Sequence, residues 1–269
     1  MVKKLYKHEF LAWLRVLPIV YMITLSVAAV HRIIQFFEND TVYYGIISGS
    51  AIFVYVIALL ACIFTPIIFG ITRFYKNLFT GEGYLSFTLP VTPGNHLWVK
   101  VLTAVVFSIL SVLVCLVSVV IITAGDVLTE IWKAAEYLLK MIPEKYVGHL
   151  WGYCGEFLTL LLISGFATYL FYYTCICIGQ LFRKNRVLAA VGVYFGYYMI
   201  NQVFSTVLGV GMAILEESGA LENIYLWIGK YPIETIHIAL GGSIAFSAVW
   251  VLVYWLICHT IIRKKLNLE

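Results

Sequence analysis

Six cysteines are the residues of this chain with the greatest chemical reactivity, yet their spacing favours packing over chemistry. None forms a C-x-x-C pair, so the pattern indicates neither a zinc knuckle nor a redox pair. Cys175 and Cys177 would point about 200° apart on a helix, which is a poor arrangement for binding one metal ion. We expect these cysteines to be small packing residues; they are Cys62, Cys115, Cys154, Cys175, Cys177 and Cys258.

Motifs for ATP hydrolysis and for common hydrolases are missing from the sequence. There is no G-x-x-x-x-G-K-[ST] phosphate loop, and neither H-E-x-x-H nor G-x-S-x-G occurs. We therefore expect no catalytic residue, no cofactor and no metal site in this chain, and we do not expect it to be an enzyme. We also expect no nucleic-acid partner.

Ionisable residues that could couple transport to protons or ions are also missing from the middle of the long apolar segments. His237 and His259 lie near opposite ends of the last segment, too far apart to act together. The polar residues near mid-depth are Asn201 and Gln202. Neutral amides at such depth most often hold helices together, and the alternative is that they line a pathway.

Composition explains where these segments must lie. Of the 269 residues, 62% are hydrophobic and 12% are charged, and the mean hydropathy is +0.94. A soluble domain normally carries about 25% charged residues, because water must solvate its surface. Most of the surface of this chain is therefore expected to face lipid.

Five segments are long and apolar enough to cross a hydrocarbon layer about 30 Å thick. They are approximately 44–72, 97–124, 157–182, 187–215 and 238–262. A sixth, 17–37, is interrupted by His31 and Arg32, and we expect Arg32 to reach the headgroups. The rival interpretation is a cleaved signal peptide, with Ser26-Val27-Ala28 as the cleavage site. The long amphipathic leading segment, which contains Glu9, favours a retained helix.

The charges between these segments predict the orientation. The first, third, fifth and last connecting segments contain 13 of the 18 basic residues but only Glu9, Glu82 and Glu269 among the 14 acidic ones. The positive-inside rule places these segments and both termini in the cytoplasm, which requires an even number of spans. We therefore expect an all-α, multi-pass protein of the cell membrane, with six transmembrane helices in a single domain over residues 1–269.

Four segments outside the spans have distinct characters. Residues 1–15 combine lysines with large apolar side chains, which predicts an amphipathic helix at the inner membrane surface. Residues 73–96 form a cytoplasmic loop, in which Gly81 and Gly83 end one helix and Thr92-Pro93 begins the next. Two extracytoplasmic segments, 125–156 and 216–236, are each expected to contain a helix; 128–139 has an apolar face.

Large apolar side chains are too numerous in the 73–96 loop for a solvated connection. We expect them to contact a partner protein, and the alternative is a lid on the lipid surface. Those side chains are Phe74, Tyr75, Phe79, Tyr84, Leu85, Phe87 and Leu89.

The same loop resembles that of the permease subunits of bacterial type-2 ATP-binding-cassette (ABC) exporters. The similar run begins at Phe74 and reads Phe-Tyr-Lys-Asn-Leu-x-x-Gly-Glu-Gly-Tyr-Leu-x-Phe-Thr-Leu-Pro-Val. The layout of an amphipathic entry helix, six spans and an outer segment before the last span is also similar.

The resemblance implies a separate ATPase subunit, a second permease subunit, either identical or related, and lipid as partners. It implies export of a hydrophobic or amphipathic cargo such as a peptide, lipid or drug. The ATPase-coupling residues would be Lys7, Phe10, Trp13, Arg73, Phe74, Tyr75, Lys76, Glu82, Tyr84, Leu85 and Pro90. The alternative function is a non-transporting immunity, sensor or scaffold subunit that docks on a partner through the same loop.

Overall fold

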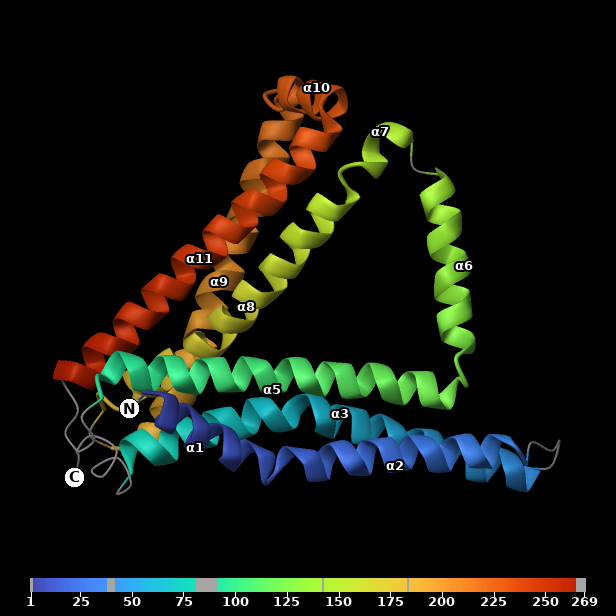
Figure 1. The fold of residues 1–269 in the computed structure, drawn as a ribbon. Helices are drawn as coiled ribbons and strands as arrows, with labels where there is room; N and C mark the ends of the chain where they lie inside the picture. The colour runs from blue at the N-terminus through green and yellow to red at the C-terminus, as the bar shows by residue number, and fades with distance from the viewer. Residues whose placement is uncertain (1, 38–41, 81–90, 142, 183, 265–269) are drawn as a thin grey trace. The chain divides into compact units, whose positions relative to one another are not determined.

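The computed structural model describes residues 2–37, 42–80, 91–141, 143–182 and 184–264 (Figure 1). Over these residues the chain is helical, and no strand occurs among them. The helices are α1 (Val2–Leu14), α2 (Leu17–Gln35), α3 (Val42–Phe79), α5 (Pro93–Ile122), α6 (Asp126–Met141), α7 (Glu144–Val147), α8 (Leu150–Gly179), α9 (Arg186–Glu217), α10 (Glu222–Lys230) and α11 (Pro232–Lys264).

Six helical stretches of the described chain are long and apolar enough to cross a membrane, as the sequence predicted. They contain α2, α3, α5, α8, α9 and α11. With its 38 residues, α3 is about 57 Å long, nearly twice the hydrocarbon thickness. The sequence placed the second span at 44–72 and the end of its helix at Gly81 and Gly83, and the length of α3 agrees with this prediction.

The chain divides into two compact units, unit 1 (residues 1–143) and unit 2 (residues 144–269). We describe each unit by itself. The prediction of one membrane domain over residues 1–269 stays a prediction.

In unit 1, α2, α3 and α5 pack against one another, and α1 packs chiefly on α5. The chain turns between α1 and α2, where the Val16 amide donates to the Trp13 carbonyl. Polar bonds join the helices inside this apolar bundle. The Tyr21 hydroxyl donates to the Phe107 carbonyl at 3.0 Å, and the hydroxyls of Tyr55 and Ser118 are 2.9 Å apart. Such bonds stabilise helix pairs in membranes by about 0.6 kcal/mol on average.

Both helix ends that flank the predicted cytoplasmic loop lie close to where the sequence placed them. The helix before the loop ends at Phe79. Thr92 occupies the N-cap of α5 with extended backbone, and Pro93 is the first helical residue, although the Thr92 side chain makes no capping bond. Proline suits this position because its missing N–H would have no helical partner there.

Helix α6 follows α5 after a sharp turn (Figure 1). The turn uses two residues with positive φ, Ala124 at 50° and Gly125 at 87°. Leu128, Ile131 and Trp132 are all more than half exposed on α6. Large apolar side chains left open in this way are the arrangement expected for a helix on a membrane surface.

In unit 2, α8 packs against α11 and α9, and the short α10 joins α9 to α11. The hydroxyls of Tyr197 and Tyr254 are 2.6 Å apart and connect α9 to α11. Thr174 of α8 donates to the Tyr254 carbonyl at 3.3 Å, and its hydroxyl lies 3.2 Å from the Cys258 sulfur. The 216–236 segment contains the short helix α10, as the sequence predicted.

Helices α8 and α9 approach each other closely at Gly179. A Cβ built on this glycine would lie 2.7 Å from the Ala190 backbone nitrogen, so only glycine fits without a shift. Gly45 with Gly49 and Gly192 with Gly196 have the G-x-x-x-G spacing, which allows close helix approach. Unlike Gly179, they contact no neighbouring helix among those that the structure describes. An added Cβ at any of these four positions meets nothing within 4 Å in the described chain.

We predict opposite effects for alanine at two glycines of unit 2. Gly179→Ala should lower the free energy of unfolding by about 1–3 kcal/mol, because its Cβ would overlap the backbone of α9. Gly196→Ala should be neutral or stabilising by up to about 1 kcal/mol, because alanine is the better helix former and the space is open. Denaturant unfolding of the purified chain in detergent measures both. Equal effects would contradict the close packing at Gly179.

Candidate functional site

Glu9, Arg73 and Lys100, one residue each from α1, α3 and α5, form a buried ion cluster. Arg73 binds the carboxylate with two bonds, Nε to Oε1 at 2.7 Å and Nη2 to Oε2 at 3.2 Å. The Lys100 Nζ lies 3.3 Å from Glu9 Oε1. One carboxylate therefore joins three helices.

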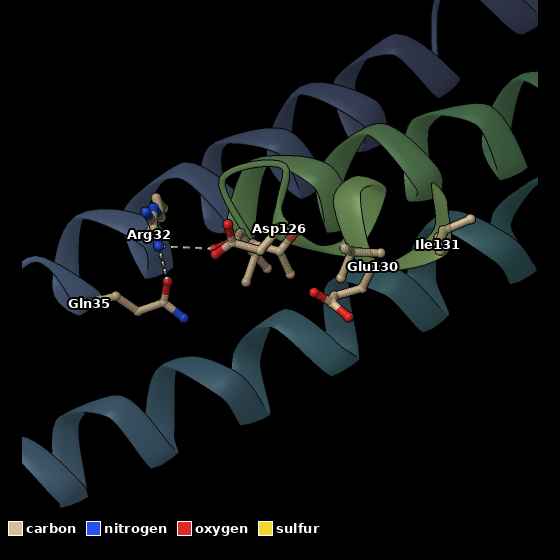
Figure 2. A pocket seen from close by; sticks show the side chains of 8 residues that line it. Arg32, Gln35, Asp126, Glu130 and Ile131 are labelled. Atoms are coloured by element: carbon tan, nitrogen blue, oxygen red, sulfur yellow. Dashed lines mark hydrogen bonds between the residues drawn. The ribbon is translucent and has the colours of Figure 1, made fainter. Parts of the chain in front are cut away.

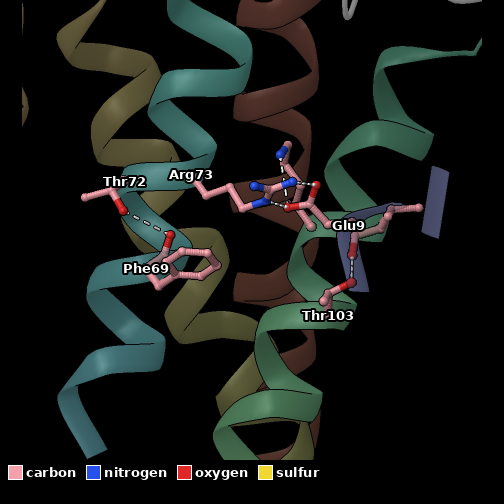
Figure 3. A network of polar contacts seen from close by, with 7 residues as sticks. Glu9, Phe69, Thr72, Arg73 and Thr103 are labelled. Carbon is pink, nitrogen blue, oxygen red and sulfur yellow. Dashed lines mark hydrogen bonds and ion pairs between the residues drawn. The ribbon is translucent and has the colours of Figure 1, made fainter. Parts of the chain in front are cut away.

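Figure 3 shows the Arg73 side chain reaching the Glu9 carboxylate. The cluster is largely buried. The side chains of Glu9 and Lys100 are each 7% exposed, and that of Arg73 is 25% exposed. Buried charges without partners are costly, so the positions of the three side chains depend on one another. The bidentate geometry also fixes the angle at which Arg73 meets the carboxylate.

Aromatic rings pack next to the cluster. The Trp13 ring lies edge-on to Phe69 at 5.0 Å and stacks on Phe107 at 5.3 Å. Phe10 lies 5.0 Å from the same Phe107 ring. These contacts join the same three helices as the ions, and they bury the Trp13 side chain of α1.

The predicted coupling residues divide according to exposure. Lys7 and Lys76 are exposed, whereas Trp13 and Phe74 are 1% and 0% exposed inside unit 1. A protein that docked on this unit would therefore contact the lysines directly and the two buried rings only through their neighbours. Phe10, Arg73 and Tyr75 are partly exposed. Glu82, Tyr84, Leu85 and Pro90 lie outside the described residues.

Asn201 and Gln202 lie in α9 and are both exposed. The Asn201 amide donates to the Tyr197 carbonyl of its own helix at 3.0 Å. Neither amide forms a bond to another helix among those that the structure describes, so their role in helix association or in a pathway stays a prediction.

The pairing of Glu9 with Lys100 was not predicted from the sequence. A signal was present, because Glu9 is the one acid of the entry segment and lies four residues before Trp13, on the same helical face. Arg73 and Lys100 lie at the ends of the two spans that flank the loop. Which spans meet at this face is decided by tertiary packing.

Unit 1 has a second polar region at the other end of α5. A pocket of about 400 Å³ is formed by α2, the end of α5 and α6. Figure 2 shows Arg32 and Gln35 on one side of it, with Asp126 and Glu130 on the other. Arg32 donates to Gln35 Oε1 at 3.0 Å. Arg32 lies in the last turn of α2, and its contact with the headgroups stays a prediction.

The two polar regions are separated by a membrane-sized length of apolar helix. Lys100 belongs to the ion cluster and Ile122 to the pocket, and the helical rise places them about 33 Å apart along α5. This separation is close to the thickness of the hydrocarbon layer.

No group of three or more His, Cys, Asp or Glu side chains in the described ranges is arranged to hold a metal ion.

Four of the cysteines, Cys62, Cys175, Cys177 and Cys258, are buried, which agrees with a packing role.

Comparison of the chain with models of known protein families, with curated proteins and with solved structures finds no match. The geometry of the chain and the resemblance of its loop therefore carry the functional argument.

We predict that Glu9→Gln lowers the free energy of unfolding by about 2–3 kcal/mol, because it leaves two cations without their shared carboxylate. Glu136→Gln is the matched control, since it removes an exposed carboxylate that pairs with Lys140 at 2.7 Å. Denaturant unfolding in detergent should show little change for the control. In a double-mutant cycle with Arg73→Gln, the losses should not be additive. Additive losses would mean that the two side chains do not interact.

We also predict that the two polar ends of unit 1 lie on opposite sides of the membrane. In a Cys154→Ser background, which removes an exposed native thiol, Lys133→Cys should react with a membrane-impermeant maleimide on intact cells. Lys7→Cys should react only after the cells are permeabilised, because the positive-inside rule places α1 in the cytoplasm. Labelling of Lys7→Cys on intact cells would show that α1 lies outside the cell, opposite to the predicted orientation.

Proposed function

We propose that this chain is the membrane-spanning permease subunit of an ATP-driven ABC exporter of the type-2 class. The observation that carries the proposal is the ion cluster, because it connects the entry helix to both sides of the loop that resembles the family's coupling loop. Arg73 lies in the helix before that loop and Lys100 in the helix after it.

The proposed mechanism follows from these connections. An ATPase subunit that binds at α1 and the loop would exert force on short segments at the cytoplasmic surface. The buried ion pairs and the Trp13 contacts would transmit this force to α3 and α5, because displacing α1 alone would separate desolvated charges. A rigid connection of this kind converts closure of the ATPase into tilting of the spans.

The missing phosphate loop agrees with ATP hydrolysis by a separate subunit. Spans without ionisable residues at mid-depth support a hydrophobic or amphipathic cargo, such as a peptide, lipid or drug, because such a cargo needs no buried counter-charge. Cell-membrane localisation is part of the same proposal.

A second permease subunit, identical or related, is proposed to contact α9. No residue of α9 is buried within the described chain. Asn201 and Gln202 are exposed near the middle of this helix, where lipid would offer their side chains no hydrogen-bond partner beyond the bond that the Asn201 amide donates within α9. A second subunit would supply such partners.

The test is co-purification with a candidate ATPase subunit, using charge reversals at the two ends of unit 1. Lys7→Glu with Lys76→Glu should weaken the complex about tenfold or more, because both exposed lysines lie at the proposed contact. Lys133→Glu with Lys140→Glu makes the same change in net charge on α6 and should leave the complex and its ATP hydrolysis intact.

If no ATPase co-purifies with the folded wild-type chain, the exporter proposal is wrong. A stable complex that neither hydrolyses ATP nor moves cargo in proteoliposomes would favour the non-transporting immunity, sensor or scaffold function. Equal losses in the two double variants would place the contact elsewhere.

A further inference from the structure

Two histidines and a glutamate meet where α8 and α11 begin in unit 2. The His237 Nδ1 lies 2.7 Å from Glu156 Oε1, and the His237 Nε2 lies 3.4 Å from the His149 Nδ1. His237 and Glu156 are each 30% exposed, and His149 is exposed. His237 therefore lies between a carboxylate and a second imidazole, with access from solvent.

The carboxylate determines which nitrogen of His237 carries a proton. A carboxylate accepts hydrogen bonds, so the short contact at Glu156 places a proton on Nδ1. In the neutral ring this leaves the lone pair on Nε2, which faces the His149 Nδ1. A ligating histidine that donates its other nitrogen to a carboxylate is the usual arrangement around zinc.

The separation of the two facing nitrogens suits one tetrahedral metal ion. Zinc–nitrogen bonds of about 2.0–2.1 Å place two tetrahedral ligands about 3.3 Å apart, and the observed separation is 3.4 Å. Square-planar ligands at the same bond length would lie about 2.9 Å apart, so the geometry favours Zn²⁺ over Cu²⁺.

Neighbouring groups hold His237 in place. The Tyr153 ring lies 4.5 Å from the His237 ring. At Gly152 an added Cβ would lie 3.3 Å from His237 Cε1, so glycine leaves room for the ring against α8. The Glu156 Oε2 is buried without a hydrogen-bond partner in the described chain. The partial positive charge at the nearby helix N-termini disfavours a bound cation. The negative charge of Glu156 offsets this effect.

We propose that His149 and His237 bind a divalent transition-metal ion, with Zn²⁺ preferred. Glu156 is the positioning residue, and water completes the coordination. Two protein ligands make a site of modest affinity that fills when external zinc is abundant. The bound ion would join the beginnings of α8 and α11. Because this site uses residues of unit 2 alone, the proposal does not depend on the exporter function.

The experiment measures Zn²⁺ binding to the full chain in nanodiscs by titration calorimetry, with the chain and the scaffold protein free of histidine tags. Wild type should bind one Zn²⁺, and Co²⁺ at the same site should show the visible absorption of tetrahedral coordination. His149→Ala and His237→Gln should abolish binding, and Glu156→Gln should weaken it about 10–100-fold.

Two control variants should bind Zn²⁺ like wild type. His259→Ala removes a histidine of unit 2 that stacks on Trp255. Cys154→Ser removes the exposed thiol of α8, which could otherwise bind zinc adventitiously. Thermal unfolding without metal confirms that each variant is folded, and His237→Gln retains a polar group that can donate to Glu156.

Absence of Zn²⁺ binding by the wild type at submillimolar concentration would overturn the proposal. Undiminished binding by folded His149→Ala or His237→Gln would also overturn it, because the ion would then lie elsewhere. Loss of the ATPase complex in co-purification would leave the zinc result unchanged, so the two proposals fail separately.

Discussion

The carboxylate of Glu9 is the constraint on which the arrangement of unit 1 depends. It binds Arg73 and Lys100 where water is largely excluded, so moving any one of α1, α3 and α5 would separate desolvated charges. Apolar packing alone would allow α1 to shift along the surface of α3 and α5, because the hydrophobic effect is non-directional and does not select one register. The ions give α1 one position, and the stack of Trp13 on Phe107 follows from it.

The interior of each unit uses polar contacts sparingly. Hydroxyl groups such as Tyr55 with Ser118 and Tyr197 with Tyr254 join helices while keeping each polar atom paired. This suits a chain in lipid, where an unpaired polar group costs several kcal/mol. Because lipid is as apolar as the helix surface, burial of apolar side chains does little to select which helix faces meet. Packing therefore depends on a few specific contacts, among them the close approach at Gly179.

Charged chemistry is concentrated at the ends of the apolar helices. In unit 1 an ion cluster and a mixed-charge pocket lie about one hydrocarbon thickness apart. In unit 2 the histidine pair lies where α8 and α11 begin. Charges at these depths can be solvated or paired, whereas charges in the middle would need a permanent partner. Both proposals use side chains at helix ends for this reason.

The sequence by itself determined the all-α architecture, the six apolar stretches and the helix boundaries at Phe79 and Thr92, because hydropathy, length and capping are local properties. Only the tertiary structure decided which polar residues meet. Glu9 and Lys100 are 91 positions apart and His149 and His237 are 88 apart, and no local pattern encodes such pairings. The G-x-x-x-G spacings show the same limit: they permit close helix approach without specifying a neighbour, and no described residue lies within 4 Å of a Cβ added at these glycines.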